Sequence, residues 1–176
     1  ACAAAARPRA HPGQPAAPSE EANDVGQLLM TGFPGFLGSA LLPRLLARRP
    51  GTDAVCLVQR QHGALARSRV KELEVTDPGT AGRVRLVVGD VTASGLGLSA
   101  ADRAGLDDVD EVWHLAAVYD LAVAPEVARR VNVEGTRHVL EFCRGLRDLR
   151  RLQYVSTCYV RGRYEGCFAE DHLGDG

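Results

Sequence analysis

The stretch from Thr31 to Gly38, TGFPGFLG, places three glycines between a short apolar run and an amphipathic segment. The apolar run is QLLMT at 27–31, which suits a buried parallel strand. After the glycines, leucines recur at helical spacing between 37 and 45, and this pattern stops near Pro50. A strand, a glycine loop and a helix in this order predict the first βα unit of a parallel sheet.

The alternation of strand and helix patterns continues along the chain. Further apolar runs predict strands at 53–59, 84–88, 110–116 and 151–155. Between them, helical patterns are predicted at 63–74 and 125–146. Because such units connect through right-handed crossovers, we expect an α/β fold with a doubly wound parallel sheet of strand order 3-2-1-4-5. Ligands of these sheets bind beyond the carboxyl ends of the strands, where the strand order reverses.

Composition divides the chain and limits its partners. Residues 1–26 hold clusters of alanine and proline without hydrophobic periodicity, which predicts a disordered tail or linker before a folded domain over 27–176. The 176 residues carry a formal net charge of -1, so nothing indicates a nucleic-acid partner. No apolar run approaches the roughly 18 residues of a membrane span.

The cysteines and histidines favour a reducing compartment and no metal site. The five cysteines are an odd set without a C-x-x-C pair, which is typical of a cytoplasmic protein with buried thiols. The histidines do not fall at zinc-ligand spacing from the cysteines. We therefore expect a cytoplasmic location and no bound metal.

Each glycine of the loop has a distinct expected role. Gly32 suits a tight turn, Gly35 allows the backbone to approach a pyrophosphate, and Gly38 allows the helix to pack closely on the sheet. The amides at the start of the helix then face the anion. A tight βα turn without a ligand is the alternative. The predicted cofactor contacts in this stretch are Thr31, Gly32, Gly35, Phe36, Leu37 and Gly38.

The spacing T-G-x-x-G-x-x-G, followed by further motifs in order, resembles the extended short-chain dehydrogenase/reductase superfamily. These motifs are GDV at 89–91, HLAA at 114–117, NVEGT at 132–136 and YVST at 154–157. The resemblance covers about residues 27–175. It implies that Asp90 and Val91 lie near the adenine, that Ala116 and Ala117 lie under the nicotinamide ribose, that Asn132 holds a water or main-chain group near the site, and that Thr157 supplies the catalytic hydroxyl.

Within the superfamily, the chain is similar to the fatty acyl-CoA reductases and carrier-protein thioester reductases of the male-sterility type. The similar stretches are FLG at 36–38, CLV at 56–58, GLGLS at 95–99 and HLAAVYD at 114–120. This similarity implies reduction of a small-molecule or carrier-bound acyl thioester or carbonyl by hydride transfer. Sugar-nucleotide epimerases and dehydratases, which prefer NAD, share several of these motifs and are one alternative. A non-catalytic dinucleotide-binding module is the other.

The end of the second predicted strand favours NADP over NAD. NAD-binding domains usually place an Asp or Glu there to hold the ribose 2′-OH, whereas this chain reads Val58-Gln59-Arg60-Gln61. Arg60 can pair with a 2′-phosphate through charge-assisted hydrogen bonds. The alternatives are that Arg60 is a solvated residue at the start of a helix, and that the cofactor is NAD.

The Tyr-x-x-x-Lys pair of the superfamily is missing from the chain. The one lysine, Lys71, is preceded at that spacing by Arg67, and Tyr159 is followed by Arg163. Arginine cannot replace the compact ammonium of lysine. We therefore expect a domain truncated before the catalytic helix, with negligible turnover by itself. Thr157 matches the hydroxyl position, with a strand-end cap as the alternative.

Two further residues have alternative interpretations. Asn132 and Gly135 are poor helix formers inside one predicted helix, so we expect a local distortion there, unless Asn132 merely faces solvent. His114 lies beside Trp113 in a buried strand and is interpreted as a satisfied core residue. A contact between His114 and cofactor or substrate is the alternative.

Overall fold

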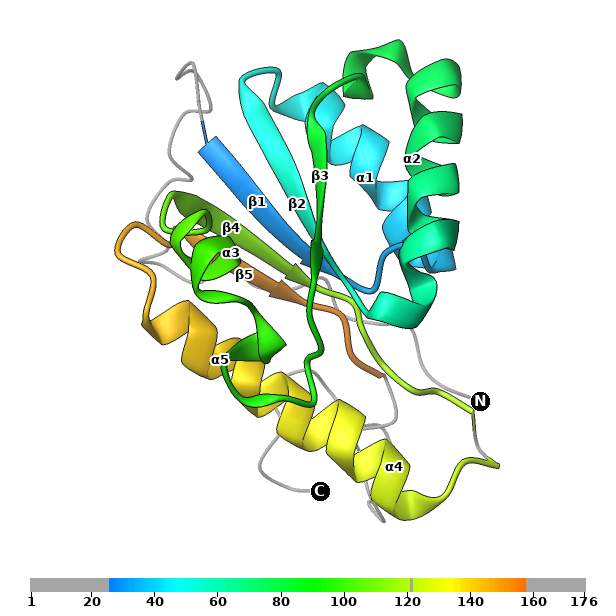
Figure 1. The fold of residues 1–176 in the computed structure, drawn as a ribbon, viewed down its shortest axis with the longest axis vertical. Helices are drawn as coiled ribbons and strands as arrows, with labels where there is room; N and C mark the ends of the chain where they lie inside the picture. The colour runs from blue at the N-terminus through cyan, green and yellow to red at the C-terminus, as the bar shows by residue number, and fades with distance from the viewer. Residues whose placement is uncertain (1–25, 121, 158–176) are drawn as a thin grey trace, which may run out of the picture.

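The computed structural model describes residues 26–120 and 122–157, and its centre is one parallel sheet. The sheet order is β3-β2-β1-β4-β5, which confirms the doubly wound arrangement (Figure 1). Each strand lies within two residues of its predicted position. The strands are β1 (Gly26–Thr31), β2 (Thr52–Val58), β3 (Val84–Val88), β4 (Val109–His114) and β5 (Arg151–Tyr154).

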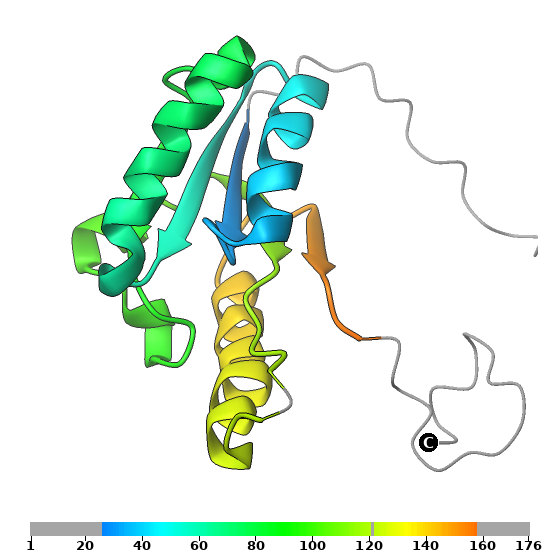
Figure 2. The ribbon, with the colours of Figure 1, turned by 90° about the vertical axis from the view of Figure 1, so that its right-hand side faces the viewer.

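Helices cover both faces of the sheet. One face carries α1 (Phe36–Arg48) and α2 (Gly63–Thr76), and the other carries α3 (Ala100–Ala104) and α5 (Thr136–Arg144) (Figure 1). Before α5 come α4 (Pro125–Arg129) and the π-helix η4 (Arg130–Gly135), which continue into it as one helical column (Figure 2). Three 3₁₀ turns complete the described elements: η1 (Arg60–His62), η2 (Pro78–Thr80) and η3 (Ser94–Gly97).

Strand β1 divides the core into two clusters because both of its faces are buried. Leu28 and Met30 pack toward α1 and α2, while Leu29 packs toward α5, and all three are fully buried. Burying a leucine side chain contributes roughly 2 kcal/mol to folding. The continuous apolar run at 27–31 is therefore the sequence signature of a strand that is covered on both sides.

Several predicted strand boundaries were wrong by one or two residues, among them the start of β1 and the end of β4. Gly26, assigned to the tail, belongs to β1 and pairs with Thr52, while the rest of the predicted tail lies outside the described residues. Strand β4 ends at His114 instead of Ala116. Beyond His114, the backbone N–H groups of Leu115 and Ala116 donate to the Thr31 hydroxyl, at 3.2 Å each.

The predicted distortion of the long helix is confirmed. Asn132 and Gly135 both lie in η4, where the chain forms a π-helix between α4 and α5. Single-turn π-helical segments are rare and occur frequently at functional sites. The side chains that η4 and the start of α5 direct toward the sheet are therefore candidate site residues.

One arginine that the sequence did not single out joins three segments at the amino edge of the sheet. The Arg83 guanidinium donates hydrogen bonds to the carbonyl oxygens of Leu46, Arg49, Thr52 and Gly79, at 2.5–3.2 Å. These carbonyls belong to the end of α1, the start of β2 and the η2 turn. A guanidinium carries five N–H donors in a rigid plane, so it can satisfy several helix-end and loop carbonyls at once.

Replacing Arg83 should therefore destabilise the fold. We expect Arg83→Met to lower the free energy of unfolding by about 2–4 kcal/mol, because several carbonyls lose a charged donor. Arg85→Met is the matched control, since Arg85 is exposed on the neighbouring strand β3 and donates to Gly105 O at 2.8 Å. Urea denaturation measures both, and equal losses in the two variants would contradict the role assigned to Arg83.

Candidate functional site

The glycine turn lies at the carboxyl edge of the sheet, between β1 and α1. Gly32 adopts a φ of +87°, and a Cβ there would lie 2.7 Å from the carbonyl carbon of Leu115. Only glycine satisfies both the left-handed backbone and this close approach. The N-terminus of α1 begins at Phe36, so its free amides open at the same edge.

The other two glycines are required by the turn itself. A Cβ on Gly35 would lie 2.7 Å from the carbonyl oxygen of Gly32, and one on Gly38 would lie 2.9 Å from the same atom. Gly38 thus allows close packing against the turn, in addition to the predicted packing of helix on sheet. Gly35 is exposed, so its surface is open to a ligand, while the side chains of Phe36 and Leu37 face outward beside it.

A cofactor diphosphate fits this edge on the geometry of the turn. The three glycines keep side chains away from the backbone, and the helix N-terminus carries partial positive charge. A carboxylate is absent from the first turn of α1, so nothing there opposes an anion. The predicted residues Gly32, Gly35 and Gly38 are thus brought together in one cradle.

Thr31 has a different surrounding from the one expected of a direct cofactor contact. Its side chain is buried, and its hydroxyl lies 2.7 Å from His114 Nδ1 while accepting hydrogen bonds from the backbone amides of Leu115 and Ala116. Because both acceptor positions of the hydroxyl are occupied, it donates its proton in the hydrogen bond to His114 Nδ1. Thr31 fixes the chain after β4 against the glycine turn, which is an indirect contribution to the site.

His114 is a satisfied core residue, as interpreted from the sequence. Its Nε2 lies 3.0 Å from the Thr136 hydroxyl, which itself donates to the carbonyl of Asn132. Because Thr31 donates to Nδ1, the proton of the neutral ring resides on Nε2. The ring also stacks on Tyr154, with centroids 5.2 Å apart. Burial lowers the pKa of His114 from 6.5 to about 4, so the ring is neutral at physiological pH.

Asn132 holds a main-chain segment, and the solvent-facing alternative is wrong. Its amide nitrogen donates to Val118 O at 2.7 Å, and its amide oxygen accepts from Val118 N at 2.8 Å. This pair of bonds closes the loop after β4 onto the π-helix. The loop carries Ala116, which is half-buried, and Ala117, which is exposed, at the same carboxyl edge.

The loop after β3 is equally constrained. One carboxylate oxygen of Asp90 accepts from Thr92 N, and the other accepts from the Gln59 side chain at 3.0 Å. Asp90 N donates to the carbonyl of Leu96, which adopts a left-handed φ of 59° that is unusual for a leucine. Val91, predicted as a cofactor contact, has its side chain buried in the core.

Arg60 lies at the end of β2, where the sequence placed it. A cavity of about 410 Å³ is lined by Gln59, Arg60, Gln61 and Asp90. The Arg60 side chain is exposed at this cavity, at the first residue of η1. Asp90 is the acidic residue of this lining, and both of its carboxylate oxygens already accept hydrogen bonds within the protein.

Thr157 is exposed and lies three residues beyond the end of β5. The chain there stays beside β4, because Val155 N donates to His114 O at 3.1 Å. Thr157 thus follows directly from the carboxyl edge. Tyr159 and Arg163 lie outside the described residues.

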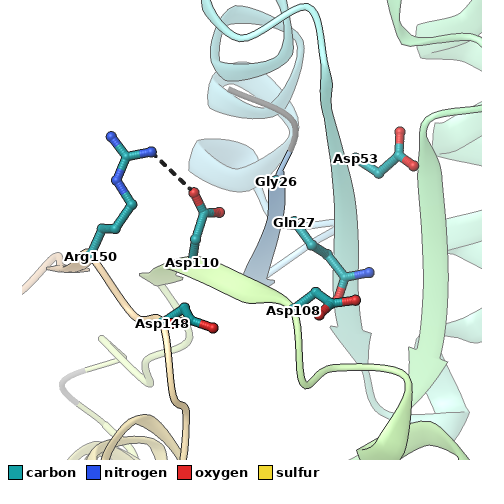
Figure 3. Close-up of a pocket in the computed structure, with 7 residues that line it drawn as sticks. All are labelled: Gly26, Gln27, Asp53, Asp108, Asp110, Asp148 and Arg150. Atoms are coloured by element: carbon teal, nitrogen blue, oxygen red, sulfur yellow. Dashed lines mark hydrogen bonds and ion pairs between the residues drawn. The ribbon is translucent and has the colours of Figure 1, made fainter. Parts of the chain in front are cut away.

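Another cavity, of about 500 Å³, lies at the opposite, amino edge of the sheet (Figure 3). It is lined by the carboxylates of Asp53, Asp108, Asp110 and Asp148, and by Arg150, whose guanidinium lies 3.5 Å from Asp110. A surface with this excess of negative charge repels phosphate. A nucleotide diphosphate is therefore disfavoured in this cavity.

The described residues hold neither a metal cluster nor an activated thiol. Over 26–120 and 122–157, no group of three or more His, Cys, Asp or Glu side chains is placed to hold a metal ion. Cys56 and Cys143 are buried and free, and burial raises their pKa to about 12 and about 11. No helix of this part is long and apolar enough for a bilayer crossing. The other three cysteines lie outside it.

The fold and the glycine turn define a class, the NAD-binding Rossmann domains. The family model described as male sterility protein matches residues 30–175. The chain therefore belongs to the male sterility protein family, an NAD-binding family whose cofactor is a nicotinamide dinucleotide. The narrower resemblance found in the sequence is confirmed.

A curated relative and two solved structures agree with this assignment. Fatty acyl-CoA reductase 1 of Xenopus laevis is 33% identical over 144 residues, which cover 76% of this chain and 28% of the relative. The terminal R domain of the myxalamid PKS-NRPS pathway has a TM-score of 0.64 and 32% identity, covering 77% of this chain and 35% of that one. The reductase domain of a Mycobacterium tuberculosis nonribosomal peptide synthetase has a TM-score of 0.65 and 27% identity, covering 81% and 35%.

The neutral state of buried His114 should make folding depend on pH. The folded-state pKa of about 4 lies below the ordinary 6.5, so the unfolded chain takes up the proton first as the pH falls. Protonation of this group should lower the free energy of unfolding progressively between pH 6.5 and about 4. Below pH 4 the group should cause no further loss. The loss should be on the order of 3 kcal/mol, because each unit of pKa difference corresponds to about 1.4 kcal/mol.

The test is chemical denaturation across pH 4–7 with His114→Gln, whose amide can accept from Thr31 and donate to Thr136 without titrating. This variant should show a flatter stability profile than the wild type. His62→Gln, at an exposed histidine of η1, is the control and should leave the profile unchanged. A His114→Gln profile that overlays the wild type would contradict the assignment.

Proposed function

We propose that this chain is the cofactor-binding part of an NADP-dependent reductase that converts an acyl thioester or related carbonyl by hydride transfer. The observation that carries the proposal is the placement of the glycine turn and the Arg60 cavity at one edge of the sheet. In this proposal residues 26–176 belong to the NADP-binding domain, since Gly26 is part of β1, and the residues before it are a tail or linker. A cytoplasmic location is part of the same proposal.

The choice of NADP rests on the charges around the end of β2. Arg60 offers a guanidinium that can bind a 2′-phosphate through two parallel hydrogen bonds. Gln59 and Gln61 add neutral amides, and Gln59 donates to Asp90 at 3.0 Å. A carboxylate that would receive the 2′-OH of NAD is missing from Val58-Gln59-Arg60-Gln61. This end of β2 favours NADP over the NAD of the epimerase alternative.

The remaining site residues divide between binding and chemistry. The amides of the Gly32–Gly38 turn would bind the diphosphate, and the loop that Asn132 fixes would hold Ala116 and Ala117 under the nicotinamide ribose. The bound cofactor supplies the hydride. Thr157 would donate its hydroxyl proton to the carbonyl oxygen in a hydrogen bond that steadies it.

The proton donor of the proposed reaction is not found in this sequence. None of its four tyrosines precedes a lysine by four positions. The chain spans 28% of the length of the fatty acyl-CoA reductases it matches, and in the proposal a further part of the protein supplies the donor. The isolated 176-residue chain would then bind cofactor with negligible turnover.

The substrate class follows from the relatives. The curated relative is named as a fatty acyl-CoA reductase, and the solved neighbours are reductase domains of peptide and polyketide synthetic assemblies. We infer a thioester of coenzyme A or of a carrier protein. Its reduction by one NADPH and one proton gives an aldehyde, the free thiol and NADP, which balances atoms and electrons.

Cofactor titration tests the nucleotide preference. By calorimetry, the protein should bind NADPH at least about tenfold more tightly than NADH, because a charged hydrogen bond contributes about 1.5–3 kcal/mol. Arg60→Ala should lose most of this preference and leave NADH affinity unchanged. Arg44→Ala removes an exposed arginine from the middle of α1 and is the control. Equal binding of both nucleotides by the wild type would reject NADP.

The role of Thr157 is tested in the protein with its donor present. Thr157→Ala should lower kcat for thioester reduction about a hundredfold, as loss of an oxyanion-stabilising donor does in other enzymes. Thr157→Ser keeps the hydroxyl and should retain most of the activity. NADPH oxidation and aldehyde formation are measured together. An equal decrease of kcat in both variants would show that the Thr157 hydroxyl does not stabilise the carbonyl oxygen.

A further inference from the structure

The segment 132–138 reaches three separate parts of the carboxyl edge. Asn132 bonds to Val118 in the loop after β4, and Thr136 bonds to His114 at the end of β4. His138 bonds to Val91 in the loop after β3. The π-helix and the start of α5 thus connect the loops on the two sides of the glycine turn.

His138 is not required by any motif, yet its contacts are well defined. The side chain is 8% exposed, and its Nδ1 lies 2.8 Å from the Val91 carbonyl oxygen. A carbonyl only accepts, so Nδ1 carries the proton and donates it. Arg137 Nη2 lies 2.9 Å from Nε2, and a guanidinium only donates, so Nε2 is the acceptor. Both ring nitrogens are therefore satisfied in the neutral form.

Close packing supports the hydrogen bond. A Cβ on Gly135 would lie 3.1 Å from Val91 Cγ2, so the end of η4 and the loop after β3 are in close contact at this glycine. The next residue back, Asp90, bonds to Gln59 beside the Arg60 cavity. A continuous path of contacts thus runs from His138 through Val91 and Asp90 to that cavity.

We propose that His138 is a positioning residue for the adenosine half of the cofactor, acting through the loop after β3. This inference rests on the proposed function of the carboxyl edge. In the order β3-β2-β1-β4-β5, a dinucleotide that crosses the β1 turn has one half over β2 and β3 and the other over β4 and β5. His138 holds the first side, whereas Asn132 holds the second.

Ligands that represent each half of the cofactor test this division. His138→Ala should weaken binding of 2′,5′-ADP about tenfold in calorimetry, because a buried hydrogen bond is lost, and should leave reduced nicotinamide mononucleotide unaffected. His138→Asn should restore most of the affinity, since its amide nitrogen occupies the place of Nδ1. Asn132→Ala should show the opposite selectivity.

Hydrogen exchange provides a reading that does not need a cofactor. The amides of Asp90 and Thr92 have hydrogen-bond partners in the loop, so they should exchange faster in His138→Ala and not in His138→Asn. The amides of β1 should keep their wild-type rates, which separates loop opening from general unfolding. Unchanged loop exchange in His138→Ala would overturn the inference.

The outcomes separate this inference from the proposed function. If the wild type does not bind 2′,5′-ADP, the NADP proposal fails and the adenosine role of His138 fails with it. If the wild type binds and His138→Ala binds equally well, the inference alone is overturned. Equal weakening of both half-cofactors would also overturn it, because the effect would then be a general loss of structure.

Discussion

The buried hydroxyl of Thr31 is the contact on which the arrangement of the carboxyl edge depends. The hydroxyl accepts hydrogen bonds from two backbone amides after β4 and donates one to His114. The other ring nitrogen of His114 is hydrogen-bonded to Thr136. Residues separated by 83 positions in the sequence are joined by this one group. Because buried polar networks are costly when incomplete, the ends of β1 and β4 and the start of α5 are held in one arrangement. The glycine turn is built on that support.

The turn itself is organised around a single carbonyl. Gly35 and Gly38 both face the Gly32 oxygen, and side chains at either position would collide with it. The turn thus needs glycines for its own internal packing. The same geometry leaves the backbone open, which suits a diphosphate. The spacing of these glycines is usually explained by the bound ligand. In this chain, the contacts with the Gly32 carbonyl oxygen explain it as well.

Local patterns predicted most of the fold and less of the site. The alternation of apolar runs and helical spacing along the chain predicted the strand order, and Asn132 with Gly135 predicted the distorted helix, because these signals are carried by neighbouring residues. Arg83 and His138 were missed because their partners lie far away in the sequence and lack a motif. Thr31 was predicted as a cofactor contact, whereas its hydroxyl bonds to residues far away in the sequence, which only tertiary contacts show.

The two edges of the sheet differ in electrical character. Carboxylates gather around the amino-edge cavity, whereas Arg60 and the N-terminus of α1 lie at the other end of the strands. At the amino edge, Arg49 pairs with Asp110 and Glu111, so part of this negative charge is compensated locally. The carboxylates around the amino-edge cavity disfavour a polyanion there, whereas Arg60 and the N-terminus of α1 attract one at the other edge, and both effects weaken as ionic strength rises.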